Sequence, residues 1–170
     1  WEPVTLPTTE NLIAISFKDA NIGFCIAENG IILKTTDGGV NWVIIQNNPT
    51  HNYKHLACVD DKMVIFGTES MPYTRKVFIS IDEGVTWTNA VNTIYPYFQH
   101  EDIQVMNNEI YYRAIGTSSM NLYKFNNNIP TVIAENVYLF GVTESTNEIL
   151  YFGKVGNTNT LFKSADSWAT

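Results

Sequence analysis

One eight-residue motif occurs twice in this chain of 170 residues and recurs in weaker form further along. Residues 35–42 are Thr-Thr-Asp-Gly-Gly-Val-Asn-Trp and residues 80–87 are Ser-Ile-Asp-Glu-Gly-Val-Thr-Trp. The shared pattern is Ser/Thr-x-Asp-x-Gly-x-Thr/Asn-Trp. Degenerate copies are centred on Asn126 and Asp166, so the motif repeats every 40 to 45 residues. This period is typical of the four-stranded blades of a β-propeller.

Short runs rich in β-branched and aromatic residues lie between the motif copies, separated by turn-forming Asn, Gly, Asp and Pro. This is the pattern of successive β-hairpins. Three runs precede each motif and one follows it. The predicted strands are 12–17, 22–27, 31–36 and 42–46; 55–59, 63–67, 76–81 and 87–90; 102–106, 109–115, 121–125 and 131–135; and 137–142, 149–154 and 160–164. The sequence therefore predicts an all-β fold of four-stranded antiparallel blades with almost no helix.

The repeat divides one predicted domain, residues 1–170, into four blade units. These units are residues 10–46, 53–90, 100–135 and 136–170. Residues 1–5 are similar to the strand that follows a motif, whereas the fourth unit has no such strand. Two arrangements follow: residues 1–5 supply that outer strand and close a four-blade ring, or the chain is an arc of a larger propeller. We favour the arc, since rings of so few blades are less common.

The motif is expected to be structural. Its aspartate can accept hydrogen bonds from backbone N–H groups of its own turn, and its glycine permits a positive φ. Its tryptophan opens the following strand and can bury a large aromatic surface. The residues to which we assign this structural role are Asp37, Gly39, Trp42, Ser80, Asp82, Gly84, Trp87 and Asp166.

The motif resembles the Asp-box, or bacterial neuraminidase repeat, of sialidases, sortilin-type receptors, xyloglucan-cleaving glycosidases and photosystem II assembly-factor-like propellers. Residues 21–42 are most similar to the assembly-factor type, with Gly-Phe-Cys-Ile-Ala-Glu-Asn-Gly ahead of Lys-Thr-Thr-Asp-Gly-Gly. The resemblance implies a β-propeller whose boxes lie on turns away from the ligand-binding centre. It implies little about function, because this scaffold serves many tasks.

The residues that a hydrolase of these families would need are missing. A sialidase clamps its substrate carboxylate with three arginines, but this chain has two, Arg75 and Arg113. A glycosidase needs two carboxylates facing each other across a cleft. The acidic doublets 60–61, 82–83 and 101–102 fall instead at predicted turns, where adjacent carboxylates are usually solvated. We therefore expect no enzymatic activity from this chain.

Charge and composition exclude further classes. The chain has 17 acidic and 10 basic residues, a net charge of −7, which argues against nucleic acid because that affinity comes from basic residues at phosphates. No apolar run approaches the roughly 20 residues of a membrane span. The histidines lack metal-ligand spacing and no cofactor-binding motif occurs. Cys25 and Cys58 lie in apolar runs and are expected to be free thiols. We expect no metal, cofactor, nucleic acid or membrane insertion.

The propeller topology predicts a candidate partner-binding surface. Connections between blades and loops between second and third strands share one face, opposite the box turns. On this sorting, His51 and Tyr53 lie in a connection between blades, and Tyr73 and Arg75 in a loop between second and third strands. Tyrosine and arginine are enriched at recognition surfaces. The candidate partner-binding residues are Tyr53, Tyr73, Arg75, Tyr95, Tyr97 and His100. The alternative is that aromatic rings of the 95–98 segment simply pack between blades.

The predicted function is a non-catalytic recognition or scaffold module that binds a protein or glycan partner. One alternative is a portion of a sialidase-like or xyloglucanase-like glycoside hydrolase whose catalytic residues lie outside this chain. A second, implied by the family resemblance, is an assembly factor for a larger complex. The one promising N-glycosylation sequence, at residues 48–50, is blocked by Pro49. This favours a bacterial or viral origin. We expect an extracellular, cell-surface or virion location.

Overall fold

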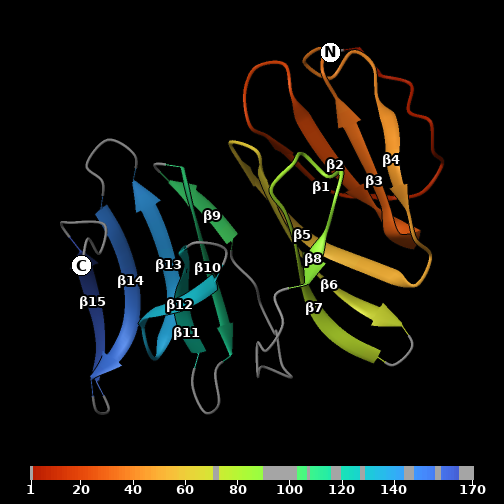
Figure 1. Cartoon of the computed structure of the whole chain (residues 1–170). Coiled ribbons are helices and arrows are strands. Elements are labelled where there is room, and N and C mark those ends of the chain that lie inside the picture. Colours follow the sequence, from red (N-terminus) through yellow and green to blue (C-terminus); the bar gives the residue numbers. More distant parts are fainter. Residues whose placement is uncertain are drawn as a thin grey trace. The chain divides into compact units, whose positions relative to one another are not determined.

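The computed structural model describes residues 2–70, 73–89, 103–106, 108–115, 120–126, 129–143, 148–155 and 158–164. These residues form fifteen β-strands and one short 3₁₀ turn. The prediction of an all-β chain is therefore confirmed. The chain divides into two compact units, Trp1–Val91 and Asn92–Thr170 (Figure 1).

The first unit contains two four-stranded antiparallel sheets (Figure 1). The first sheet is β1 (Leu12–Phe17), β2 (Gly23–Ala27), β3 (Ile31–Thr35) and β4 (Val43–Asn47), with the 3₁₀ turn η1 (Glu28–Gly30) between β2 and β3. The second is β5 (His51–Val59), β6 (Lys62–Ser70), β7 (Tyr73–Ser80) and β8 (Thr88–Asn89). In both sheets the strands follow chain order and the Asp-box turn joins the third strand to the fourth, as predicted.

The second unit contains one four-stranded and one three-stranded antiparallel sheet. The first is β9 (Ile103–Met106), β10 (Glu109–Ile115), β11 (Met120–Asn126) and β12 (Ile129–Ala134); the second is β13 (Val137–Thr143), β14 (Glu148–Val155) and β15 (Thr158–Ser164). The division of the chain into blade units 10–46, 53–90, 100–135 and 136–170 stays a prediction. Residues 2–5 form no strand, so the outer strand predicted at 1–5 is not seen in the described part of the chain. The choice between a ring and an arc stays a prediction.

Strands β5, β6 and β7 extend further than the sequence predicts. His51 pairs with Glu69 across β5 and β6, and β7 begins at Tyr73 instead of residue 76. From the sequence, His51 and Tyr53 are predicted to lie in a connection between blades, but the side chains of this segment alternate between exposed Asn52 and Lys54 and buried Tyr53. This alternation is that of a strand with one face against a core. His51 and Tyr53 therefore lie in β5 and not in a connection.

The core of the first unit lies between its two sheets. It is formed by buried apolar side chains of both: Phe24, Ile26, Ile32, Tyr53, Leu56, Cys58, Met63, Ile65 and Phe78. Burying one such side chain fully contributes about 1.5–3 kcal/mol. Cys25 and Cys58 are free and buried, as predicted. Burial raises the pKa of Cys25 to about 11 and that of Cys58 to about 12, so both stay protonated near neutral pH.

The core of the second unit is built from aromatic rings of β10 and β11. Tyr112 stacks on Tyr123 with ring centroids 5.0 Å apart and planes inclined by 12°. Phe125 extends the group, 5.2 Å from Tyr112. Each of these three rings is at most 1% exposed, so they contribute to packing and none of them presents a face to a ligand.

Candidate functional site

The first Asp-box turn is closed by its own hydrogen bonds. Asp37 Oδ1 accepts from the hydroxyl of Thr35 at 2.8 Å and from the backbone N–H of Asn41 at 2.8 Å. The indole N–H of Trp42 donates to the carbonyl oxygen of Gly39 at 3.0 Å. Gly39 has φ of 93°, a conformation that side-chain-bearing residues avoid. The hydrogen bond from the Asn41 backbone, followed by those from the Asn41 and Thr35 side chains, lowers the pKa of Asp37.

The second box repeats this geometry. Asp82 Oδ1 accepts from Ser80 at 2.7 Å and from the backbone N–H of Thr86 at 2.8 Å. The indole of Trp87 donates to the carbonyl oxygen of Gly84 at 3.1 Å. The side-chain hydrogen bond from Thr86 is the main reason why the pKa of Asp82 is lowered. Both boxes use their carboxylates to close a turn. The remaining predicted box residue, Asp166, lies outside the described residues.

An ion-pair network ties the second box turn to the first sheet. Glu83 accepts from Lys18, which follows β1, and from Lys34 on β3 at 2.7 Å. Lys18 also contacts Asp61 at 2.9 Å. Hydrogen bonding to Lys18 is the largest cause of the lowered pKa of Glu83. Glu83 and Asp61, one member of each of two acidic doublets, thus pair with lysines of the first sheet. The Glu83 side chain is 23% exposed, whereas that of Asp61 is 69% exposed, as expected for a solvated carboxylate.

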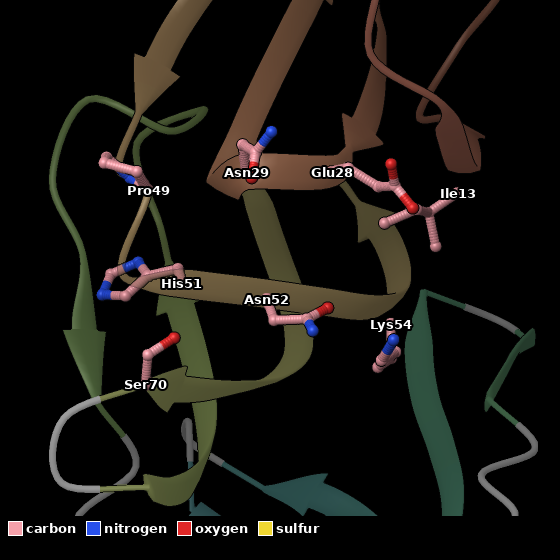
Figure 2. Close-up of a pocket in the computed structure, with 8 residues that line it drawn as sticks. All are labelled: Ile13, Glu28, Asn29, Pro49, His51, Asn52, Lys54 and Ser70. Carbon is pink, nitrogen blue, oxygen red and sulfur yellow. The ribbon is translucent and has the colours of Figure 1, made fainter.

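A polar hollow of about 330 Å³ lies at the opposite end of these strands from the box turns (Figure 2). This volume is at the lower end of the range of small-ligand pockets. The hollow collects residues from β1, η1, the β4–β5 connection, β5 and β6. They are Ile13, Glu28, Asn29, Pro49, His51, Asn52, Lys54 and Ser70. The propeller topology predicts that turns between second and third strands share one face with the connections between sheets. In the first unit, the turn η1 and the β4–β5 connection meet at this end of the strands.

Backbone hydrogen bonds hold the walls of the hollow in place. The N–H of Glu28 donates to the carbonyl of Asn11, and the N–H of Asn48 donates to the carbonyl of Gly30, both at 3.0 Å. On the other side, the N–H of Ser70 donates to the carbonyl of Thr50 at 2.8 Å. The turn η1 and the ends of β5 and β6 are therefore fixed by main-chain contacts. Their side chains remain available to a ligand.

Several of these side chains have no hydrogen bond within the described part of the protein. Asn29, Asn52 and Lys54 are exposed, and within the described residues their side chains make no hydrogen bond to the protein. Glu28 uses one carboxylate oxygen, which accepts from the side chain of Asn11 at 2.9 Å. Two amides, one ammonium group and one carboxylate oxygen therefore remain to contact a ligand.

His51 is held as a neutral ring at one side of the hollow. Asn48 Oδ1 accepts two hydrogen bonds from Thr50, from its backbone N–H at 3.2 Å and from its hydroxyl at 2.7 Å. The Asn48 NH₂ group therefore faces His51 Nε2, which lies 3.3 Å away. Because that group donates, Nε2 acts as the acceptor and the ring proton is assigned to Nδ1. Nδ1 lies 3.1 Å from the hydroxyl of Tyr53. Desolvation by burial lowers the pKa of His51, in agreement with the neutral form.

The predicted partner-binding residues do not all gather at this hollow. Tyr53 is 1% exposed and its hydroxyl contacts His51 and Gln46, so its ring belongs to the core and not to an exposed surface. Tyr73 and Arg75 lie on β7, where Tyr73 pairs with Ser70 at the hollow's end of the sheet. The other three candidates, Tyr95, Tyr97 and His100, lie outside the described residues.

Sequence reasoning missed Glu28, Asn29, Asn52 and Lys54 as lining residues. Candidates in a turn between second and third strands were predicted for the second sheet only. The corresponding turn of the first sheet contains Glu28 and Asn29. Asn52 and Lys54 lie in the same segment as Tyr53, but the candidates were chosen among tyrosine, arginine and histidine side chains.

The described residues contain no group of three or more His, Cys, Asp or Glu side chains that could hold a metal ion. Within the same ranges, no helix is long and apolar enough to cross a membrane. The acidic residues with lowered pKa values are engaged in turns or ion pairs. The groups that line the hollow and remain available to a ligand are the carboxamides of Asn29 and Asn52 and the ammonium group of Lys54.

Antiparallel four-stranded sheets with Asp-box turns between their third and fourth strands define a chain of the Asp-box β-propeller class. The family model of the photosynthesis system II assembly factor YCF48 matches residues 1–90, and the chain belongs to this family. The Asp-box resemblance to assembly-factor propellers is thereby confirmed, and so is the absence of an enzymatic role.

Sequence relatives match a short part of the chain. The photosystem II assembly lipoprotein Ycf48 of Prochlorococcus marinus strain MIT 9313 is 48% identical over 42 residues, which are 25% of this chain and 12% of that protein.

Solved structures of the family share the fold over nearly the whole chain. A structure of YCF48 bound to D1 peptide has a TM-score of 0.60 at 17% identity, covering 95% of this chain and 53% of that one. YCF48 from Cyanidioschyzon merolae has a TM-score of 0.60 at 16% identity, covering 99% and 60%. The chain therefore spans somewhat over half the length of these two structures.

Proposed function

We propose that this chain is the recognition part of an assembly factor and that it binds a polypeptide segment of a partner protein. Of the functions that the sequence suggests, the assembly factor is best supported, because the family match covers residues 1–90. A related structure holds a D1 peptide, which supports a protein as the kind of partner.

The observation that carries this proposal is the polar hollow. Its walls are fixed by backbone hydrogen bonds while Asn29, Asn52 and Lys54 remain available. Such preorganised polar groups reduce the entropy cost of ordering a ligand. A glycan is less well supported, since the hollow is lined by aliphatic and polar side chains and its one aromatic ring, His51, already packs 4.6 Å from the ring of Phe78.

The proposal is tested by titrating the chain with a D1 peptide in a calorimeter, with a peptide of the same composition in scrambled order as control. We expect saturable binding of the D1 peptide and at least tenfold weaker binding of the scrambled one, since a tenfold difference corresponds to about 1.4 kcal/mol. Equal binding of both peptides, or none, would contradict recognition of this partner.

A further inference from the structure

The hollow combines two exposed carboxamides from different elements. Asn29 belongs to the turn η1 of the first sheet and Asn52 to strand β5 of the second. Figure 2 shows these two residues between the Pro49, His51 and Ser70 side of the hollow and the Glu28 side. Neither amide has a hydrogen-bonding partner among the described residues, so both can serve a ligand.

The backbone at Asn29 is held in an uncommon conformation. Its φ of 58° and ψ of 29° are left-handed, a region that asparagine tolerates better than most residues with a side chain. Gly30 follows with φ of 66°, and its carbonyl is bound by the N–H of Asn48 at 3.0 Å. The Asn29 carboxamide therefore stands on a rigid base, as a preorganised contact requires.

The charges around the two amides are balanced. The lining contains one acidic residue, Glu28, and one basic residue, Lys54. Beside His51, Glu69 lies 4.0 Å from Nε2 and forms an ion pair with Lys76 at 2.8 Å. A site for phosphate or a free carboxylate would collect positive charge or several N–H donors. This balance favours a ligand group that is polar and uncharged.

A carboxamide offers one acceptor oxygen and two N–H donors. In an extended chain the N–H and the C=O of one residue point to the same side, so an asparagine carboxamide can accept from that N–H and donate to that C=O. The volume of about 330 Å³ fits a short stretch of peptide, given the usual sizes of ligand pockets.

We propose that the hollow binds an extended peptide segment by its main-chain groups, through the side chains of Asn29 and Asn52, and not by a charged terminus or side chain. This inference rests on the proposed function, and it specifies how the partner is recognised: main-chain pairing sets affinity at this site, and sequence preference comes from contacts beyond it.

The test adds tetraalanine to the isotope-labelled chain and monitors the amide chemical shifts of the chain by NMR. The peptide is used in two forms, one with acetyl and methylamide caps and one with free termini. The capped peptide is expected to shift the signals of residues 29 and 52–54. Asn29→Gly, which keeps the positive φ, and Asn52→Ala should each weaken its binding about threefold to tenfold, the loss expected for one neutral hydrogen bond.

Asn21→Ala is the matched control, because Asn21 is exposed at the box end of the first sheet, and this variant should bind as the parent does. Lys54→Met and added salt should change the affinity less than twofold. Binding of the free-terminus peptide alone, with loss in Lys54→Met, would overturn the inference and indicate a carboxylate site. Absence of shifts at residues 29 and 52–54 would overturn it as well.

The two proposals fail in distinguishable ways. If the D1 peptide binds while capped tetraalanine does not reach the hollow, the main-chain inference is wrong and the proposed function stands. If capped tetraalanine binds there while D1 and scrambled peptides are not distinguished, the proposed partner is wrong and the inference stands.

Discussion

Gly30 shows how a single residue joins the two sheets of the first unit. It occupies a left-handed position with φ of 66°. A Cβ at this position would lie 1.9 Å from the carbonyl oxygen of Asn48, a residue of the β4–β5 connection. The same contact places Asn29 beside the hollow, so glycine is required by both the fold and the site.

We expect Gly30→Ala to lower the free energy of unfolding by more than about 2 kcal/mol, because left-handed strain and a backbone clash add together. Urea unfolding measures this change. Gly38→Ala is the control: Gly38 has a φ of 72°, but the nearest atom to its added Cβ is 3.1 Å away. That variant should lose about 1–2 kcal/mol, mainly from left-handed strain, because the 3.1 Å approach to the Ala20 carbonyl oxygen needs a much smaller shift than the 1.9 Å approach at Gly30. Equal losses in the two variants would contradict the importance of the Asn48 contact.

His51 makes the stability of the first unit sensitive to pH. Because burial lowers the pKa of His51 from its ordinary 6.5, the unfolded chain binds more protons than the folded one between the lowered pKa and 6.5. Stability must therefore fall as the pH is lowered through this window. The lowered pKa values of Asp37, Asp82 and Glu83 act at lower pH, below ordinary values of 3.8 and 4.5.

We expect the melting temperature to drop between pH 7.5 and 5.5, and this drop to be smaller in His51→Gln, which cannot take up the proton. Differential scanning calorimetry of both proteins at the two pH values measures it. If the variant and the parent lose the same amount, the buried neutral state of His51 does not contribute to the pH dependence.

At the scale of strands and turns, the second box turn stabilises the neighbouring sheet as well as its own hairpin. Glu83 follows the box aspartate and receives Lys18 and Lys34 of the first sheet. Its side chain is 23% exposed and that of Lys18 12%, so the network is partly shielded from solvent. Partly buried networks are worth more than single exposed pairs, which contribute 0 to about 1 kcal/mol.

Glu83→Gln is expected to lower the free energy of unfolding by roughly 1 kcal/mol at low salt, and less in about 1 M NaCl, where exposed charges are screened. Asp61→Asn is the control, since the Asp61 carboxylate pairs with Lys18 and its side chain is 69% exposed, while its backbone contact to Glu83 does not depend on the side chain. It should cost less than about 0.5 kcal/mol. Denaturant titrations at two salt concentrations measure both, and a salt-independent loss in Glu83→Gln would argue against an electrostatic cause.

The same scale shows what the sequence could predict. The box turns and most strands were predictable, because their signals are local: a repeated Asp-x-Gly pattern and runs of alternating apolar residues. The start of β5 was not, since residues 51–54 become a strand only by pairing with residues 67–69 of β6. Gly67 permits this pairing, as a Cβ there would lie 2.7 Å from the carbonyl oxygen of Asn52.

The hollow was only partly predictable for a similar reason. The predicted loop topology selects the end of the strands where the hollow lies, but Glu28 and Asn29 meet His51 and Asn52 through packing between two sheets. The burial of Tyr53 also depends on this packing, since the residue lies in the core shared by both sheets. Contacts of this kind leave no pattern in a single stretch of sequence.

At the scale of the whole molecule, the first unit has its box turns and the hollow that we propose for recognition at opposite ends of its strands. The box turns, with their hydrogen-bonded aspartates and the Glu83 network, occupy one end. The hollow, with side chains available to a ligand, occupies the other. The proposed recognition role of the hollow thus leaves the turns that close the sheets untouched.

The most direct test of this account is amide hydrogen exchange of the chain with and without a saturating peptide partner. We predict slower exchange in residues 28–30 and 51–54, which line the hollow, and unchanged exchange in the box turns at residues 35–42 and 80–87. Slower exchange in the box turns, with no change around the hollow, would contradict the assignment of recognition to the hollow.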